Sequence, residues 1–218
     1  MDSIKTIIVF LCMLNFWNTY AQSYVLEEVD AQLCRIGNED QQIRKKLMEA
    51  VQQQSPDIVS VLAEMKAIDV SNQKYVSELL DKHRWPEKLS DDANRALFFV
   101  IDHAQNPFAE KYFPLVKEVA AKGVLQQSDA ATLEDRILMR NMKKQKYGTQ
   151  SISKKNEKGE NVTYIWPIED GEKVDELRMS VGLSPINQYM QMLENQSNQK
   201  VIWDKEIAVS DFNITSFQ

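Results

Sequence analysis

The stretch that decides the fold is residues 133–183, LEDRILMRNMKKQKYGTQSISKKNEKGENVTYIWPIEDGEKVDELRMSVGL. It contains three polar groups: Asp135-Arg136 inside a helical pattern, residues 147–150 (YGTQ) just after it, and residues 167–170 (PIED) further on. Apolar-faced helices upstream could bury one side of this stretch. Its polar groups are therefore the first place to look for a site.

The part between YGTQ and PIED has the period of a β-strand. Val162, Tyr164 and Trp166 alternate with other residues, and residues 156–159 (NEKG) have the composition of a turn. We therefore predict one small β-hairpin near residues 149–166.

The rest of the chain predicts helices, so the expected class is mainly α, a single-domain helical bundle with the hairpin inserted. In residues 24–53 we expect two helices broken at Gly37-Asn38, and a later helix should end near Trp85-Pro86. Residues 93–104 (ANRALFFVIDHA) are apolar on every side of a helix, which is typical of a buried central helix.

Four segments follow from these patterns. They are a signal peptide over residues 1–21, amphipathic helices over 22–82, a helical core with the hairpin over 83–194, and a tail over 195–218. The tail is rich in Asn, Gln and Ser, so we expect it to be loosely held, although Val201, Trp203 and Ile207 could dock as a strand.

The amino terminus has the pattern of a secretory signal peptide. Lys5 precedes the apolar run of residues 7–14, and small or polar residues follow, so cleavage is expected after Ala21. The run is shorter than the ~20 apolar residues that span a bilayer, so no stable membrane insertion is expected after cleavage. A lipoprotein signal at Cys12 is disfavoured because bulky Leu11 precedes it. We expect a soluble, exported bacterial protein, either periplasmic or extracellular.

The charge of the chain argues against nucleic acid as a partner. The net charge is −6, and cleavage removes one acid, Asp2, and one base, Lys5. Nucleic acids and anionic lipids bind mainly through phosphate neutralisation by lysine and arginine. A local basic cluster is interpreted as a solvated hairpin tip; it comprises Lys143, Lys144, Lys146, Lys154, Lys155 and Lys158.

The common catalytic and metal-binding signatures do not occur in the sequence. After cleavage Cys34 is the single cysteine, so no intramolecular disulfide is possible, and the histidines are His83 and His103. The sequence has no HExxH, paired CxxC, glycine-rich phosphate loop or GxSxG. We expect no cofactor and no metal.

From Trp85 to Tyr189 the order of motifs resembles an uncharacterised bacterial family, domain of unknown function 6624. The matching residues are Trp85-Pro86, His103-Ala104, Asp135-Arg136, residues 147–150, residues 167–170, Arg178 and Gly182-Leu183, with Asp40-Gln41 and Arg44 upstream. Two positions depart from the family's pattern: Asp102 stands where glutamine is usual, and Leu177-Arg178 where two arginines often occur. The resemblance implies an architecture and candidate residues but no reaction.

The first functional hypothesis is an exported binding or interaction module. Here Gln150 satisfies backbone groups, Asp170 caps the following helix, and Asp135 or Asp170 pairs with Arg178. The candidate ligand-binding residues are Arg136, Tyr147, Gln150, Asp170 and Arg178. The partner would be a protein or a small anionic ligand.

The second hypothesis is an exported enzyme of hydrolase or proton-transfer type. His103 would be the general acid or base, because imidazole titrates near neutrality, and Asp135 or Asp102 would orient it. Arg136 and Arg178 would bind an anionic group, and Gln150 would donate to a developing oxyanion. The two hypotheses differ in whether these residues share one open concavity or are separately paired and covered.

Overall fold

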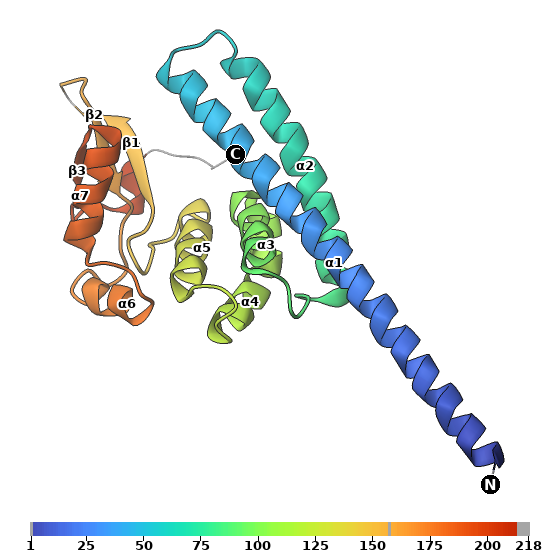
Figure 1. Cartoon of the computed structure of the whole chain (residues 1–218). Coiled ribbons are helices and arrows are strands. Elements are labelled where there is room, and N and C mark those ends of the chain that lie inside the picture. The colour runs from blue at the N-terminus through green and yellow to red at the C-terminus, as the bar shows by residue number, and fades with distance from the viewer. Residues whose placement is uncertain (1, 157, 213–218) are drawn as a thin grey trace. The chain divides into compact units, whose positions relative to one another are not determined.

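The computed structural model describes residues 26–156 and 158–212 in full, and ahead of residue 26 it gives only the path of the first helix (Figure 1). Seven α-helices and three strands confirm the mainly α class. In chain order the elements are α1 (Asp2–Gln52), α2 (Ile58–His83), α3 (Asp91–His103), α4 (Asn106–Ala121), α5 (Gln127–Arg140), β1 (Ser151–Lys155), β2 (Asn161–Ile165), α6 (Val174–Ser180), α7 (Ile186–Ser197), β3 (Lys200–Ile202) and the 3₁₀ helix η1 (Val209–Phe212). The predicted signal peptide and its cleavage site lie outside the fully described residues.

The chain divides into two compact units, Met1–Val100 and Ile101–Gln218. The sequence suggests one helical bundle, with a segment boundary between residues 82 and 83. The observed division falls instead inside α3, where no turn or change of composition marks it in the sequence.

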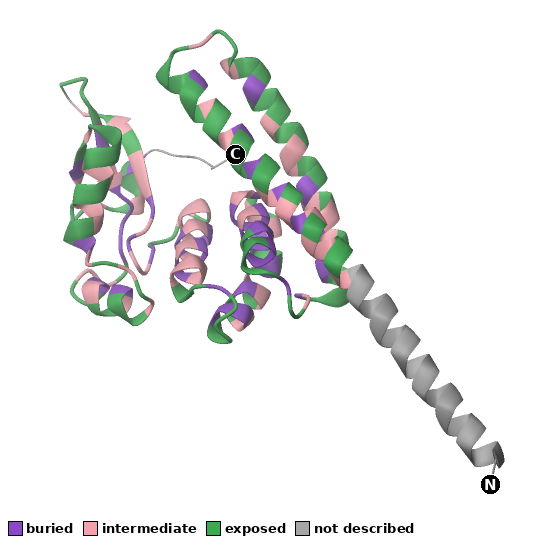
Figure 2. Cartoon of the chain, in the orientation of Figure 1, coloured by how far each residue is buried: buried purple, intermediate pink, exposed green. Residues whose placement is uncertain are grey.

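In the first unit α1 and α2 form a helical hairpin, and buried residues recur along both helices (Figure 2). The predicted break at Gly37-Asn38 is wrong, because α1 continues through both residues. A Cβ on Gly37 would lie 2.8 Å from the Cβ of Ala96 on α3. Glycine is therefore needed here for close helix packing, not for a turn.

An ion-pair network joins α1 to α2. Arg44 lies 3.1 Å from Asp40, which is buried, and 2.7 Å from Asp69 on α2. Asp40 and Arg44, which belong to the family pattern, thus fasten the helical hairpin.

The end of α2 agrees with the prediction for Trp85-Pro86. The helix ends at His83, and Trp85 is buried with its indole N–H donating to Asn94 Oδ1 at 2.7 Å. Its polar atom is thereby satisfied inside the core, as buried tryptophans require.

The predicted hairpin is confirmed, and the structure adds a third strand. β1 pairs antiparallel with β2, and β3 pairs parallel with β2, so the strand order is β1-β2-β3. The first part of the predicted tail is therefore ordered by the sheet, as the alternative of a docked strand proposed. Val201 is buried and contributes to a core with Ile165, Ile168, Val174 and Ile186.

In the fully described part of the chain, no helix combines the length and the apolar character that crossing a membrane requires.

Candidate functional site

Residues 145–150, which we call the Tyr147 loop, are held by the carboxylate of Asp135 on α5. Asp135 is 0 % exposed. It accepts hydrogen bonds from the backbone N–H groups of Lys146 (2.7 Å), Tyr147 (3.1 Å) and Thr149 (3.0 Å), and from the Thr149 hydroxyl (2.9 Å). One buried side chain thus satisfies three backbone donors of a loop that has no ladder partner for them.

The environment of Asp135 explains its electrostatics. Burial raises the pKa of the Asp135 carboxyl, because the charged form loses its hydration. The hydrogen bonds from Thr149, Lys146 and Tyr147 oppose this rise, and burial is the larger effect. The hydrogen bonds of this carboxylate run to the loop, as a structural anchor requires.

Arg178 on α6 holds the same loop from the carbonyl side. Its side chain is 1 % exposed, and Nη1 donates to the backbone oxygens of Tyr147 (2.6 Å) and Gly148 (3.3 Å). Nε donates to the oxygen of Ser184 at 2.5 Å, and the guanidinium carbon lies 4.9 Å from the ring centroid of Tyr189. Burial lowers the pKa of Arg178. Its donors thus serve the chain's own backbone.

Gly148 occupies a position that only glycine fits. Its φ is +68°, and a Cβ there would lie 2.8 Å from the terminal methyl groups of Ile168 and Ile186. The residue beside Tyr147 therefore combines a left-handed backbone with close packing.

Gln145 is a structural residue that the sequence analysis missed. It is 0 % exposed; its amide nitrogen donates to the oxygens of Gln150 (3.0 Å) and Trp166 (2.6 Å), and its Oε1 accepts from the Gln150 N–H (2.8 Å). It ties the loop to the end of β2. A lone glutamine after two lysines carries no sequence signal for this role.

Two other predicted residues lie at the edge of this arrangement. The Gln150 side chain donates to the backbone oxygen of Thr132 at 3.4 Å and to Thr149 Oγ1 at 3.2 Å. Asp170 accepts from the N–H groups of Glu172 and Lys173 at 3.2 Å each, just before α6. Both form bonds of the kind that the binding-module hypothesis expects.

A second group, the Asp102 cluster, contains Asp102 and His103 from the end of α3 and Arg136 and Arg140 from α5. Arg136 Nε lies 2.9 Å from Asp102 Oδ1, an ion pair that lacks the alignment of a hydrogen bond. His103 Nε2 lies 4.0 Å from Asp102 Oδ2, and Arg140 donates to the Ala104 oxygen at 2.6 Å. Burial and the charge of Arg136 lower the pKa of Arg140.

The candidate residues thus fall into two groups with different partners. Asp135, Tyr147, Gln150 and Arg178 are joined by the Tyr147 loop, whereas His103 and Arg136 gather around Asp102. The orienting carboxylate beside His103 is Asp102, one of the two alternatives that the enzyme hypothesis named.

A pocket of about 340 Å³ opens beside Tyr147, between α4, α5 and the end of α6. We call it the Tyr147 pocket. Its lining is formed by four alanines, Val181 and Tyr147, together with Lys117, Gln127, Glu134 and Lys146; the alanines are Ala120, Ala121, Ala130 and Ala131. It combines an apolar surface with charged groups.

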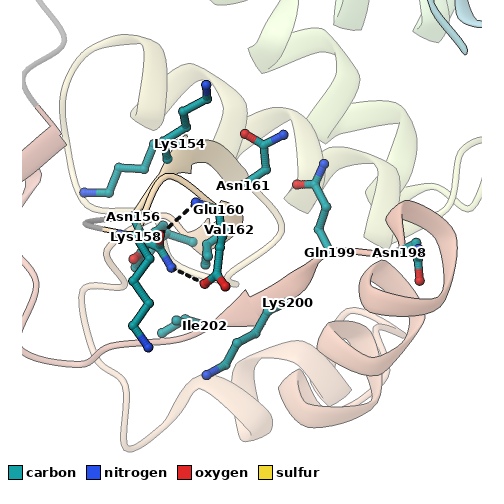
Figure 3. Close-up of a pocket in the computed structure, with 12 residues that line it drawn as sticks. Lys154, Asn156, Lys158, Glu160, Asn161, Val162, Asn198, Gln199, Lys200 and Ile202 are labelled. Carbon is teal, nitrogen blue, oxygen red and sulfur yellow. Dashed lines mark hydrogen bonds between the residues drawn. The ribbon is translucent and has the colours of Figure 1, made fainter.

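A second pocket, of about 810 Å³, lies at the tip of the β-hairpin and beside β3 (Figure 3). We call it the hairpin pocket. Lysine and amide side chains dominate its lining. Neither of these two pockets is lined by His103 or Arg136.

Among the described residues, no group of three or more His, Cys, Asp or Glu side chains is placed to hold a metal ion.

A model described as a family of unknown function (DUF6624) matches residues 27–202. The resemblance drawn from the motifs is thereby confirmed. No curated protein and no solved structure matches the chain.

Proposed function

We propose that this chain, which belongs to the DUF6624 family of unknown function, is an exported binding module that takes a small ligand in the Tyr147 pocket. The observation that carries the proposal is that two buried charges fix the backbone of Tyr147, while Tyr147 itself lines a pocket.

The motif residues are used to hold Tyr147 in position. Asp135 binds the N–H of Tyr147 and Arg178 binds its carbonyl oxygen, so both polar groups of this peptide unit are occupied by buried side chains. Gly148 sets the direction in which the chain leaves. Binding sites gain affinity when their contact residues are held in place before the ligand arrives.

The chemistry of the pocket supports a small amphiphilic anion as the ligand. Alanine methyl groups provide an apolar floor, and the volume of about 340 Å³ is at the lower end for small-molecule sites. Lys117 and Lys146 bring two ammonium groups, and Glu134 pairs with Lys146 at 2.6 Å. A carboxylate on a ring or short alkyl chain matches this distribution.

A binding role fits these residues better than a catalytic one. A catalytic acid, base or oxyanion donor must be able to meet substrate. Asp135 and Arg178 are covered, and they bind backbone groups of their own chain.

The enzyme alternative rests on one separate observation, the Asp102 cluster. There a buried carboxylate lies 4.0 Å from His103 and 2.9 Å from Arg136. It is the arrangement in which a histidine could act as acid or base beside an arginine that binds an anion.

Export is the second part of the proposal and rests on the signal-peptide pattern of residues 1–21. The secreted chain would begin at Gln22.

Ligand-observed NMR on the chain from Gln22 onward tests the binding site. The probes are benzoate, phenylacetate and hexanoate, with benzamide and benzylamine as uncharged and cationic counterparts. Ala130→Leu fills the pocket, and Ala63→Leu is the matched control on an exposed position of α2. Circular dichroism verifies that both variants are folded.

We expect at least one carboxylate to bind the wild-type chain and Ala63→Leu, and to bind Ala130→Leu at least about tenfold more weakly, a change of about 1.4 kcal/mol. Failure of every carboxylate to bind, or equal binding to Ala130→Leu, would refute the proposed site.

A further inference from the structure

The hairpin pocket is built from segments that are distant in the sequence. The end of β1 and the hairpin turn form one side, and residues 198–202, which include β3, form another. The four lysines of the lining are Lys154, Lys155, Lys158 and Lys200, and the acidic residue there is Glu160. Such a gathering of positive charge contrasts with the net charge of −6 for the chain.

The sheet register places two of these lysines on either side of one apolar residue. Lys154 on β1 and Lys200 on β3 both pair with Val162 on the central strand β2. Residues paired across strands share a face of the sheet, and two strand spacings separate these Cα atoms by about 10 Å. Edge protection by lysine explains a charge on either outer strand, but not why both line one pocket.

The remaining ammonium groups extend the basic surface along the hairpin. Figure 3 shows Lys158 and Lys200 extending in the same direction in this view, whereas Asn161 and Gln199 point the other way. The turn that carries Lys158 is fixed, because Asn156 Oδ1 accepts from the N–H groups of Lys158 (3.0 Å) and Glu160 (2.9 Å). The Lys158 backbone is therefore held before any ligand binds.

Amide groups provide hydrogen-bond donors between the charges. The Gln199 oxygen accepts from Thr163 Oγ1 at 3.2 Å and from Ser153 Oγ at 3.4 Å, so its NH₂ group is directed away from these hydroxyls. Asn161 and Asn198 also line the pocket. Amides of this kind bind hydroxyl and oxyanion oxygens.

Glu160 does not cancel the positive field. Its carboxylate accepts a hydrogen bond from the Asn156 amide at 2.8 Å, and it faces four lysines. Like charges held close together repel, and an anion of several charges relieves that repulsion.

We propose that the hairpin pocket binds a small polyanion, a molecule that carries two or more carboxylate or phosphate groups. This proposal is independent of the Tyr147 pocket, because no residue lines both. A volume of about 810 Å³ accommodates a ligand of several such groups. A phosphate chain and an acidic sugar oligomer share this chemistry, and the experiment distinguishes them.

Isothermal titration calorimetry with three probes tests the proposal: inorganic triphosphate, trigalacturonate with its three carboxylates, and neutral maltotriose. The variant Lys158→Gln/Lys200→Gln removes two ammonium groups at exposed positions. Lys144→Gln is the control, since Lys144 is exposed and does not line the pocket. Ala130→Leu reports on the Tyr147 pocket.

We expect triphosphate, trigalacturonate or both to bind, and binding should weaken as salt rises because exposed charges are screened. The double variant should lose at least about tenfold in affinity, whereas Lys144→Gln and Ala130→Leu should retain wild-type affinity to within about twofold. Binding of one anion alone identifies its class as the ligand type.

Three results would overturn the proposal. They are no binding of either anion, equal weakening by Lys144→Gln and by the double variant, and binding of maltotriose as tight as that of trigalacturonate. Loss of carboxylate fragment binding at the Tyr147 pocket would leave this result untouched.

Discussion

Replacing Asp135 by alanine removes the acceptor on which the Tyr147 loop depends. Three backbone N–H groups, from Lys146, Tyr147 and Thr149, lose their partner inside the molecule. A buried donor without a partner costs about 1–3 kcal/mol, and water entering the space left by the carboxylate offsets part of that cost. We therefore expect Asp135→Ala to lower the free energy of unfolding by about 3–5 kcal/mol.

Urea unfolding measures this loss, and hydrogen exchange locates it. In the wild-type chain the amides of Lys146, Tyr147 and Thr149 should be protected, and in Asp135→Ala they should exchange much faster. Glu176→Ala, at an exposed position on α6, is the control and should change stability by less than about 0.5 kcal/mol. A loss below about 1 kcal/mol for Asp135→Ala, with the loop amides still protected, would refute the role of Asp135 as anchor.

Four further predictions follow from individual positions. Gly148→Ala should cost about 2–4 kcal/mol in urea unfolding, because it adds a methyl group 2.8 Å from two isoleucines at a φ of +68°; an unchanged midpoint would contradict this packing. Trp85→Ala should cost about 3–5 kcal/mol through the loss of a buried aromatic ring, and a cost under about 1 kcal/mol would show that the ring is not part of the core. Lys155→Ala, at an exposed position of the hairpin, should change stability by less than about 0.5 kcal/mol, and a larger loss would mean that this lysine is structural. Intact mass of the exported protein should correspond to a start at Gln22, whereas an acylated start at Cys12 would exclude cleavage after Ala21.

Local patterns predicted much of the fold. The alternation of Val162, Tyr164 and Trp166 located the hairpin, and Trp85-Pro86 located the end of a helix. Both signals depend on residues that are neighbours in the sequence. Gly37 misled the analysis, because a glycine required by close packing against Ala96 looks the same in sequence as one required by a turn.

The candidate site was predictable only as a set of residues. Asp135 and Arg178 stood out as charges beside a predicted core, but their partners are backbone atoms of the Tyr147 loop, which no side-chain pattern encodes. The hairpin pocket could not be found, because β3 has only three residues and its pairing with β2 is a long-range contact. Lys200 therefore looked like part of a tail.

Protein-observed NMR with the tightest-binding carboxylate fragment tests the central claim most directly. In a ¹⁵N-labelled chain, titration should shift the amide signals of Lys146, Tyr147 and Val181, which line the Tyr147 pocket. Those shifts should be absent in Ala130→Leu. Shifts confined to Asp102, His103 and Arg136 would contradict the account and favour the enzyme alternative.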